Sequence, residues 1–255
     1  MTNSKKVVEI FWTGGYDSTF RVVQLSRMNV IIRPYYLSDN RIAENYEISA
    51  IEKATKLIRE HPDTKAELLD LVFIPVSDRP EGDEEIKAAY DRIFSKNWLG
   101  SQYVWLAEFA KQHKGIELSI EKGTNPVKLI EKNGGFKKAT VDGVGETFIV
   151  DEKTHSDYYS IFGNFSIPLL EISKLDMKAF FLENGYADVM KATWFCHSPI
   201  NGKPCGKCKP CKGVVEEGLS ERLDEEALER YRKAKKKDKI KATPVFKLAK
   251  KILRR

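Results

Sequence analysis

Phe11-Trp12-Thr13-Gly14-Gly15-Tyr16-Asp17-Ser18-Thr19 is the stretch around which the sequence is organised. An apolar, β-branched run at residues 7–11 leads into it, and residues 20–25 have the composition of a buried helix. The expected order is therefore strand, glycine turn, helix. Adjacent glycines lack a Cβ, so the turn can point its N–H groups inward, and the following helix aims its free N–H groups at the same place. The stretch predicts an anion site.

Polar side chains complete this predicted site. Asp17 and Ser18 stand where the N-cap of the helix is expected, with a carboxylate able to hold Mg²⁺ and hydroxyls able to bind phosphate oxygens. The stretch contains neither the Gly-Lys-Ser/Thr ending of a Walker A loop nor a Gly-x-Gly-x-x-Gly dinucleotide motif. The alternative interpretation is an ordinary turn that caps a helix.

Further strands are expected at residues 30–37, 69–76 and 116–120, with amphipathic helices between them. This alternation predicts an α/β fold with a doubly wound parallel sheet, in which ligands bind at the carboxyl ends of the strands. The polar group Glu121-Lys122-Gly123-Thr124-Asn125 follows the fourth strand and is a second candidate for ligand contact, the alternative being a simple turn.

Later segments are expected to add a hairpin and two further elements. Residues 134–157 are expected to form hairpins as an insertion or lid, and residues 161–170 an extended segment. Ser173-Lys174-Leu175-Asp176 predicts a capping box that starts a helix, and Asn184-Gly185 ends it. The face expected to be buried comprises Ile172, Leu175, Ala179 and Leu182. Ser101 is the expected cap of an earlier apolar helix.

Length and charge suggest one main domain with an extension. The 255 residues carry a net charge of +6, but residues 232–255 hold 12 Lys/Arg and 1 Asp, which leaves −5 on residues 1–231. We expect an α/β domain at 1–190 with an insertion at about 134–157, a helical region at 191–231 that contains all the cysteines of the chain, and a basic tail at 232–255. No apolar run approaches the roughly 18 residues of a membrane span, so the expectation is a cytoplasmic protein with no membrane contact.

Four cysteines, the complete set in the chain, lie within 16 residues with the spacing C-x8-C-x2-C-x2-C: Cys196, Cys205, Cys208 and Cys211. Clustered cysteines in a cytosolic chain point to a metal rather than to disulfides. Four thiolates complete a closed tetrahedral Zn²⁺ shell, which is typical of a structural site. An iron–sulfur cluster and unliganded reduced thiols are the alternatives. With all four cysteines as ligands, none is left to act as a nucleophile or sulfur carrier.

The stretch at residues 13–19 resembles the Ser-Gly-Gly-x-Asp-Ser loop of the PP-loop ATP pyrophosphatases, with Thr13 in place of the usual Ser. These enzymes have an adenine nucleotide alpha hydrolase-like fold and cleave ATP between its α and β phosphates. The resemblance implies that Thr13, Gly14, Gly15, Tyr16, Asp17, Ser18 and Thr19 bind ATP with Mg²⁺ and grip the departing pyrophosphate.

The loop and the cysteine cluster together resemble the 7-cyano-7-deazaguanine synthase (QueC) family of queuosine biosynthesis. The similarity extends over most of residues 6–220, including Arg41…Glu47 and the Asn97…Ala107 helix entry. It implies a carbon–nitrogen ligase that adenylates 7-carboxy-7-deazaguanine or a related acceptor and then uses ammonia to form an amide and a nitrile. Asp17, Ser18 and Lys122 are the expected catalytic residues, and the cofactors are ATP, Mg²⁺ and Zn²⁺.

One segment departs from this family. In place of its Gly-Tyr-Pro-Asp-Cys-Arg-like substrate segment the chain has Asn125-Pro126-Val127-Lys128-Leu129-Ile130. The acceptor is therefore expected near Lys122, Asn125 and the 134–157 insertion. A PP-loop tRNA-modifying enzyme and a diverged relative from an antiviral defence system are the alternative functions, together with a non-catalytic module that binds nucleotides and nucleic acid.

The basic tail is expected to end in a short amphipathic helix from Thr243-Pro244, with Val245, Leu248, Ala249 and Ile252 on one face. So short a helix is unstable alone and needs a surface to dock on. The expected surfaces are the chain's own body or a sister subunit in a homodimer, with nucleic acid or another anionic partner as the alternative.

Overall fold

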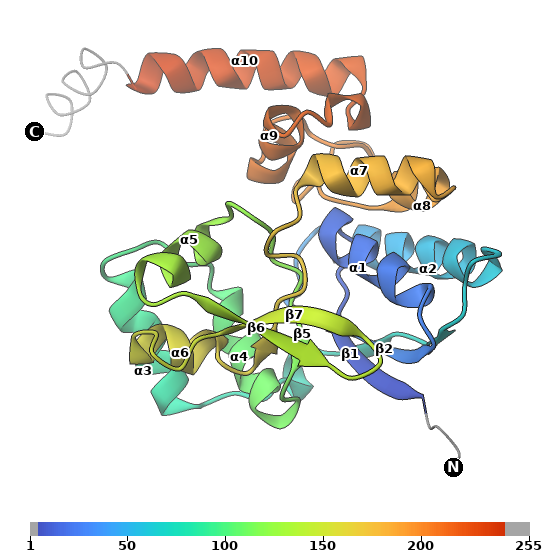
Figure 1. Ribbon diagram of the computed structural model, residues 1–255. Coiled ribbons are helices and arrows are strands. Elements are labelled where there is room, and N and C mark those ends of the chain that lie inside the picture. The colour runs from blue at the N-terminus through green and yellow to red at the C-terminus, as the bar shows by residue number, and fades with distance from the viewer. Residues whose placement is uncertain (1–4, 243–255) are drawn as a thin grey trace, which may run out of the picture. The chain divides into compact units, whose positions relative to one another are not determined.

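The computed structural model describes residues 5–242 and divides into two compact units, Met1–Trp194 and Phe195–Arg255 (Figure 1). The first unit alternates strands and helices in the order β1 (Lys6–Phe11), α1 (Tyr16–Ser26), β2 (Val30–Leu37), α2 (Glu44–Glu60), β3 (Glu67–Leu68), β4 (Val72–Ile74), η1 (Val76–Asp78), α3 (Glu84–Phe94), α4 (Gln102–Gln112), β5 (Ile116–Glu117), α5 (Asn125–Lys132), β6 (Phe136–Val141), β7 (Gly145–Val150), α6 (Ser156–Phe162), β8 (Phe165–Ser166), α7 (Lys174–Glu183) and α8 (Ala187–Ala192).

The main sheet is parallel, as the alternation of strands and helices predicts. Its strand order is β3-β2-β1-β5-β8, and β4 pairs with the carboxyl-terminal half of β2. The chain builds outward from β1 in one direction and then, from β5, in the other. The point between β1 and β5 is therefore the topological switch point of the sheet, where ligands bind in open α/β folds.

Helices cover both faces of this sheet. Phe11 and Tyr35 pack on Phe109 of α4, with ring centroids 5.6 and 5.1 Å apart. Tyr36, one position further along β2, points to the opposite face and donates a hydrogen bond to Glu47 of α2. Because neighbouring strand residues point to opposite faces, this places α4 on one side and α2 on the other. Helices α1, α2, α7 and α8 pack with one another, and α3, α4 and α6 form a second group (Figure 1).

The third and fourth predicted strands are shorter than expected. Residues 69–76 were expected to be one strand, but β3 ends at Leu68 and β4 covers only Val72–Ile74. Asp70 lies in the break, where its exposed carboxylate accepts a hydrogen bond from Arg59, so the polar residue turns outward instead of continuing the ladder. Strand β5 has only two residues, and so does its neighbour β8. In the 161–170 segment, which was expected to be extended, only Phe165–Ser166 is a strand; α6 ends at Phe162, and turns cover most of the other residues.

Helix α7 begins at the predicted capping box, in which the Ser173 and Asp176 side chains bond to each other's backbone N–H, and its C-cap is Asn184. The predicted buried face is wrong. Leu175 and Leu182 are 57% and 53% exposed, whereas Phe181 is fully buried. Phe181 packs edge-on against Tyr16 and Phe20 of α1, so contact between aromatic rings selects a different face of the helix.

Two predicted helix caps differ in detail. Helix α1 begins at Tyr16 with Gly15 as its N-cap, so Asp17 and Ser18 lie in the first turn instead of at the cap. Ser101 is the N-cap of α4 by position, but its backbone is helical and its side chain accepts no capping hydrogen bond. The carboxylate of Asp17 is still favourable beside the positive end of the α1 dipole.

The insertion at 134–157 contains the predicted hairpin. Strands β6 and β7 are antiparallel, with Phe136 opposite Val150 at one end and Val141 opposite Gly145 at the other. It is joined to the main sheet at β8. The hydroxyls of Thr147 and Ser166 share a buried hydrogen bond of 2.8 Å, and the Ile167 N–H donates to Phe148 O at 2.7 Å.

The second unit contains α9 (Lys209–Glu216), η2 (Ser220–Arg222) and α10 (Glu225–Ala242). Its small core includes Val214, Leu219, Leu223 and Ala227. Helix α10 runs through residue 232, where the basic tail was expected to begin. The amphipathic helix expected from Thr243 lies outside the described residues. Among the helices within residues 5–242, none combines the length and apolar character needed to cross a bilayer.

Candidate functional site

The loop after β1 follows a path that only glycine permits at one position. Gly14 has φ +66°, and a Cβ there would lie 2.6 Å from the backbone oxygen of Glu47 in α2. Its carbonyl accepts a 2.8 Å hydrogen bond from the Trp194 N–H, and the Trp194 ring stacks on Tyr46 at 4.7 Å. The loop is thus clamped between α2 and the last residue of its unit.

Thr13 and Ser18 carry the hydroxyls that line this loop. Thr13 is exposed, and its N–H and hydroxyl both lie 3.4 Å from the Ser18 Oγ. The Ser18 hydroxyl also lies 3.4 Å from the carbonyl of Gly15. These contacts are long for hydrogen bonds, so both hydroxyls can be redirected to a ligand at little cost.

Two residues of the predicted ATP-binding stretch point into the core instead. Thr19 is fully buried and accepts a 2.9 Å hydrogen bond from the Trp12 indole, which is itself fully buried. Tyr16 is 4% exposed and packs on Phe181. Their side chains hold the loop and α1 in place, and the polar side chains left around the loop are exposed Thr13, partly exposed Asp17 and Ser18, which is 7% exposed.

A lysine that the sequence analysis missed joins Asp17 to the end of β5. Lys174, the first residue of α7, forms ion pairs with Asp17 and, at 3.2 Å, with Glu121. All three side chains are largely buried, being 14%, 27% and 9% exposed. Asp17 follows β1 and Glu121 follows β5, so the three charges meet at the switch point of the sheet. Carboxylate oxygens are the ligands that a divalent cation prefers, so Asp17 and Glu121 are candidates to hold one beside Lys174.

Lys122, the lysine expected to be catalytic, is exposed, and the lysine that contacts Asp17 is Lys174. Asn125, at the start of α5, donates a 2.7 Å hydrogen bond to the carbonyl of Trp98, whose side chain is 58% exposed. Lys122 and Asn125, one and four residues after Glu121, are thus exposed, whereas the Glu121 side chain is buried.

The Arg41…Glu47 segment forms a network at the carboxyl end of β2. Glu47 accepts hydrogen bonds from Arg41 at 2.6 Å and from the Tyr36 hydroxyl at 2.7 Å. Burial, followed by the nearby Glu47 carboxylate, raises the pKa of Tyr36, so Tyr36 stays a neutral donor. Since the Glu47 carbonyl is the atom that Gly14 packs against, this network also fixes the glycine loop.

Arg79 lies just beyond β4, at the same edge of the sheet. Its guanidinium stacks on Trp105 of α4 at 4.7 Å and reaches Glu81 at 3.5 Å. The side chain is 10% exposed, and its Nε and Nη1 have no hydrogen-bond partner among the described residues. A buried guanidinium with unused donors is costly, and a planar oxyanion is the ligand that matches it.

The four cysteines of the second unit come together as their spacing predicts. Their Sγ atoms all lie within 4.8 Å of one another, with Cys205–Cys211 and Cys196–Cys208 at 3.9 Å. A tetrahedral zinc with Zn–S bonds of about 2.3 Å requires S···S separations of about 3.8 Å, so the cluster has the right size for the ion. The structure therefore contains a candidate closed metal centre made of four sulfurs.

Backbone donors surround these sulfurs. The Cys196 Sγ accepts from the Cys205 N–H at 3.2 Å, and the Cys205 Sγ accepts from the N–H groups of Lys207 and Cys208 at 3.4 and 3.3 Å. Such donors stabilise thiolates and orient metal ligands. A hydrogen bond from Cys211 lowers the pKa of the Cys208 thiol.

Helix α10 holds the cysteine loop from outside. Arg230 donates to the carbonyls of Cys205 at 3.0 Å and Pro204 at 3.4 Å. Gly206 has φ +73°, and a Cβ there would lie 1.9 Å from the Ala227 carbonyl, so only glycine permits this approach of the loop to α10.

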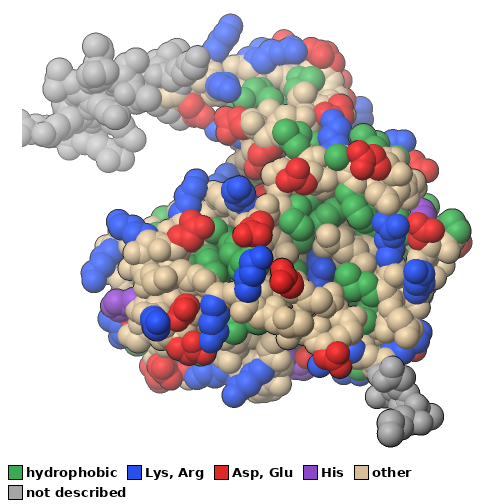
Figure 2. All heavy atoms as spheres, in the orientation of Figure 1, with side chains coloured by type: hydrophobic (Ala, Val, Ile, Leu, Met, Phe, Trp, Pro, Cys, Tyr) green, Lys and Arg blue, Asp and Glu red, His purple; other side chains and the backbone are tan. Residues whose placement is uncertain are grey.

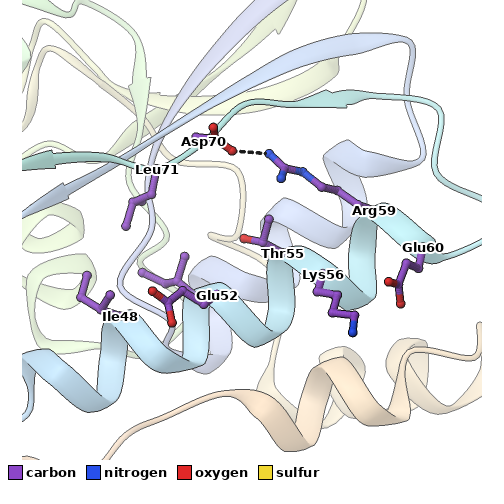
Figure 3. A pocket seen from close by; sticks show the side chains of 9 residues that line it. Ile48, Glu52, Thr55, Lys56, Arg59, Glu60, Asp70 and Leu71 are labelled. Atoms are coloured by element: carbon purple, nitrogen blue, oxygen red, sulfur yellow. Dashed lines mark hydrogen bonds and ion pairs between the residues drawn. The ribbon is translucent and has the colours of Figure 1, made fainter.

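A separate groove of about 570 Å³ lies on α2 and the β3–β4 connection (Figure 3). Arg59 and Asp70 pair across it, and no residue of the 13–19 loop lines it. The groove lies outside the switch point. The comparison with known protein families matches no family model, and the search of curated proteins finds no match.

Proposed function

We propose that the chain is an ATP-dependent carbon–nitrogen ligase of the PP-loop type, similar to the 7-cyano-7-deazaguanine synthases. The observation that carries this proposal is the meeting of Asp17, Lys174 and Glu121 at the switch point, beside the glycine loop and the first turn of α1. This arrangement combines backbone donors, a cation and two carboxylates, which is what binding of a magnesium-bound polyphosphate requires.

The proposed first step is adenylation of a carboxylate. An acceptor carboxylate oxygen attacks the α phosphorus of ATP, and the bond from that phosphorus to the oxygen bridging to the β phosphate breaks. The bridging oxygen leaves with the electron pair, giving an acyl adenylate and pyrophosphate. Charge develops on pyrophosphate, so groups placed around it accelerate this step.

The residues have distinct roles in this step. The N–H groups at the start of α1 and the Ser18 hydroxyl bind the leaving pyrophosphate, and Lys174 neutralises its growing charge. Asp17 and Glu121 are the residues that would hold a magnesium ion, which shields the phosphate charge when bound. Arg41, on the loop after β2, is proposed to contact the nucleotide portion of ATP.

The second step makes the carbon–nitrogen bond. Ammonia attacks the acyl carbon and displaces AMP, giving an amide. In the reaction of the resembled family, a second ATP adenylates the amide oxygen, and the nitrile forms as that oxygen leaves on AMP and the nitrogen loses two protons. None of these steps needs a cysteine nucleophile, in keeping with four cysteines that share one cluster.

The acceptor is proposed to bind on the open side of the switch point. In α5, which replaces the family's substrate segment, Val127 and Ile130 are buried, and the exposed side chains of Lys122 and Asn125 at its N-terminal side are proposed to supply the polar contacts. Arg79 supplies the unused donors for an acceptor carboxylate. A 7-deazaguanine carboxylate matches these groups, and so does another planar carboxylate.

Product analysis with ATP labelled at the α phosphate tests the ATP chemistry. We expect magnesium-dependent AMP and pyrophosphate, and a loss of about 10²-fold for Lys174→Met. Lys191→Met on α8 is the matched control, because Lys191 is 71% exposed and pairs only with Asp188 on its own helix among the described residues. Equal activity of both variants, or ADP and orthophosphate as products, contradicts the proposal.

Calorimetry with 7-carboxy-7-deazaguanine tests the acceptor. Lys122→Ala and Arg79→Met should weaken acceptor binding while ATP binding is unchanged, because neither residue contacts the glycine loop. Tight binding that neither substitution alters would place the acceptor elsewhere, and no binding by the unaltered protein would direct the search to other carboxylates.

A further inference from the structure

The two units of the chain carry opposite charge. Residues 195–255 contain 18 Lys/Arg and 8 Asp/Glu, a net charge of +10, whereas residues 1–194 have a net charge of −4. Four thiolates around a Zn²⁺ ion have a combined charge of −2, so they would offset only two of these positive charges. A single-sign excess of this size on about 60 residues attracts polyanions and repels cationic surfaces.

Residues 243–255, outside the described residues, hold +5 of this charge; within residues 195–242 the net charge is +5, and it comes from the C-terminal part of α10, since residues 195–231 have a net charge of −1 and residues 232–242 a net charge of +6. The first half of α10 packs on the second unit through Ala227 and Tyr231, which are 0% and 6% exposed. From residue 232 to residue 238 no side chain is buried, and five of the seven residues are Lys or Arg. Lys and Arg side chains follow α10 in the space-filling view, with fewer acidic groups between them (Figure 2).

Carboxylates within the unit neutralise part of this segment. Arg232 pairs with Glu225 at 2.7 Å and Lys233 with Glu229 at 3.0 Å, and Asp238 pairs with Lys212. Lys236 and Lys237, by contrast, have no carboxylate within 4.0 Å among the residues that the structure describes.

Like charges one turn apart destabilise a helix by a few tenths of a kcal/mol each, and no buried face offsets this in residues 232–238. The segment is thus stabilised by any partner that brings regularly spaced negative charge. Lys236 and Lys237 lie about one helical turn of 5.4 Å from Lys233, a spacing that can follow successive phosphates of a nucleic-acid strand once a phosphate replaces the Glu229 carboxylate at Lys233.

We propose that residues 195–242 form a nucleic-acid-binding module in which α10 lies along the phosphodiester backbone and the cysteine-centred core holds the helix. A bilayer is a poorer match, because no large hydrophobic side chain is exposed among the described residues of this unit. The contacts described are with phosphate only, so the module predicts affinity without sequence preference. This inference goes beyond the proposed ligase function and is independent of it.

Fluorescence anisotropy with the zinc-loaded full chain tests the proposal. The probes are a labelled RNA hairpin and a labelled DNA duplex of equal length, over a salt series. Lys236→Gln/Lys237→Gln should reduce the slope of log K against log salt by about 1.4–1.8, because each lost phosphate contact removes about 0.7–0.9. The comparison of RNA with DNA identifies which nucleic acid binds more tightly.

Lys53→Gln/Lys56→Gln on α2 is the matched control, since it removes the same charge from two exposed lysines of the other unit. An unchanged slope for this control, with the loss confined to the α10 variant, supports the proposal. Equal losses for both variants, no salt-dependent binding, or tighter binding to phosphatidylserine vesicles than to either nucleic acid would overturn it. ATP turnover on a small carboxylate should be the same in all three proteins, so failure of the ligase proposal is detected separately.

Discussion

Gly14→Ala should destabilise the first unit by more than the conformation of residue 14 alone explains. With φ +66°, an alanine here costs about 1–2 kcal/mol. In addition, its Cβ would lie 2.6 Å from the Glu47 carbonyl and 3.2 Å from side-chain atoms of Ala50 and Ile51. The first of these contacts is with helix backbone, so α2 must shift, and overpacking of this kind adds about 1–3 kcal/mol.

Gly115→Ala is the matched control for this effect. Gly115 has φ +84°, so the conformational cost is similar, but an added Cβ would meet no atom within 4 Å. We therefore expect a loss of about 1–2 kcal/mol for Gly115→Ala and about 2–5 kcal/mol for Gly14→Ala.

Urea unfolding monitored by tryptophan fluorescence measures the difference. The four tryptophans are Trp12, Trp98, Trp105 and Trp194, all within the first unit, so the signal reports on that unit alone. Gly14→Ala should also lower ATP affinity if the proposed function holds, since the displaced loop carries the N–H groups that are proposed to bind phosphate. Equal destabilisation by the two substitutions would refute the close packing of the loop against α2.

Three further predictions address the metal centre, the core and the loop. The purified chain should contain one zinc ion, and iron with visible absorbance would contradict this. Cys208→Ser should lose the zinc and the helical circular-dichroism signal of the second unit, while the tryptophan fluorescence stays unchanged. Glu117→Gln should cost about 3–5 kcal/mol in urea unfolding, because it leaves buried Arg21 without the carboxylate that it contacts twice at 2.7 Å; a loss below 1 kcal/mol would refute the burial of the pair. Asp17→Ala and Ser18→Ala should change the free energy of unfolding by no more than about 1 kcal/mol. Both variants should release AMP and pyrophosphate about 10²-fold more slowly, as measured by product chromatography.

The parallel sheet could be predicted because its central strands are buried on both faces. The β1 and β2 segments are mostly apolar runs, each interrupted by one charged residue (Glu9 and Arg33), and the structure confirms both to within one residue. The edge strands could not be placed as well. Strand β4 pairs on one side only, and Phe73 is 43% exposed, so apolar composition there does not indicate an uninterrupted strand.

The cysteine cluster could be predicted from spacing alone, whereas the cation of the loop site could not. The thiols lie close in the chain, so short turns bring them together. Lys174 and Asp17 are 157 residues apart, and their contact depends on the docking of α7 against α1. Lys122 stood at the end of a predicted strand and was therefore the lysine expected from sequence; the structure turns its neighbour Glu121 inward instead.

Lys174 is nevertheless placed by a signal that is local in the sequence. The Ser173–Asp176 capping box fixes where α7 begins, so Lys174 is the first helical residue and its side chain leaves the helix at the N-terminal end. The Phe181 contact with Tyr16 and Phe20 fixes the rotation of the same helix against α1. One end of α7 is set by a cap and its rotation by aromatic packing, and together these direct the Lys174 ammonium toward the two carboxylates. A substitution at Ser173 should therefore weaken the ion pairs of Lys174 with Asp17 and Glu121, even though Ser173 itself contacts neither of these two carboxylates.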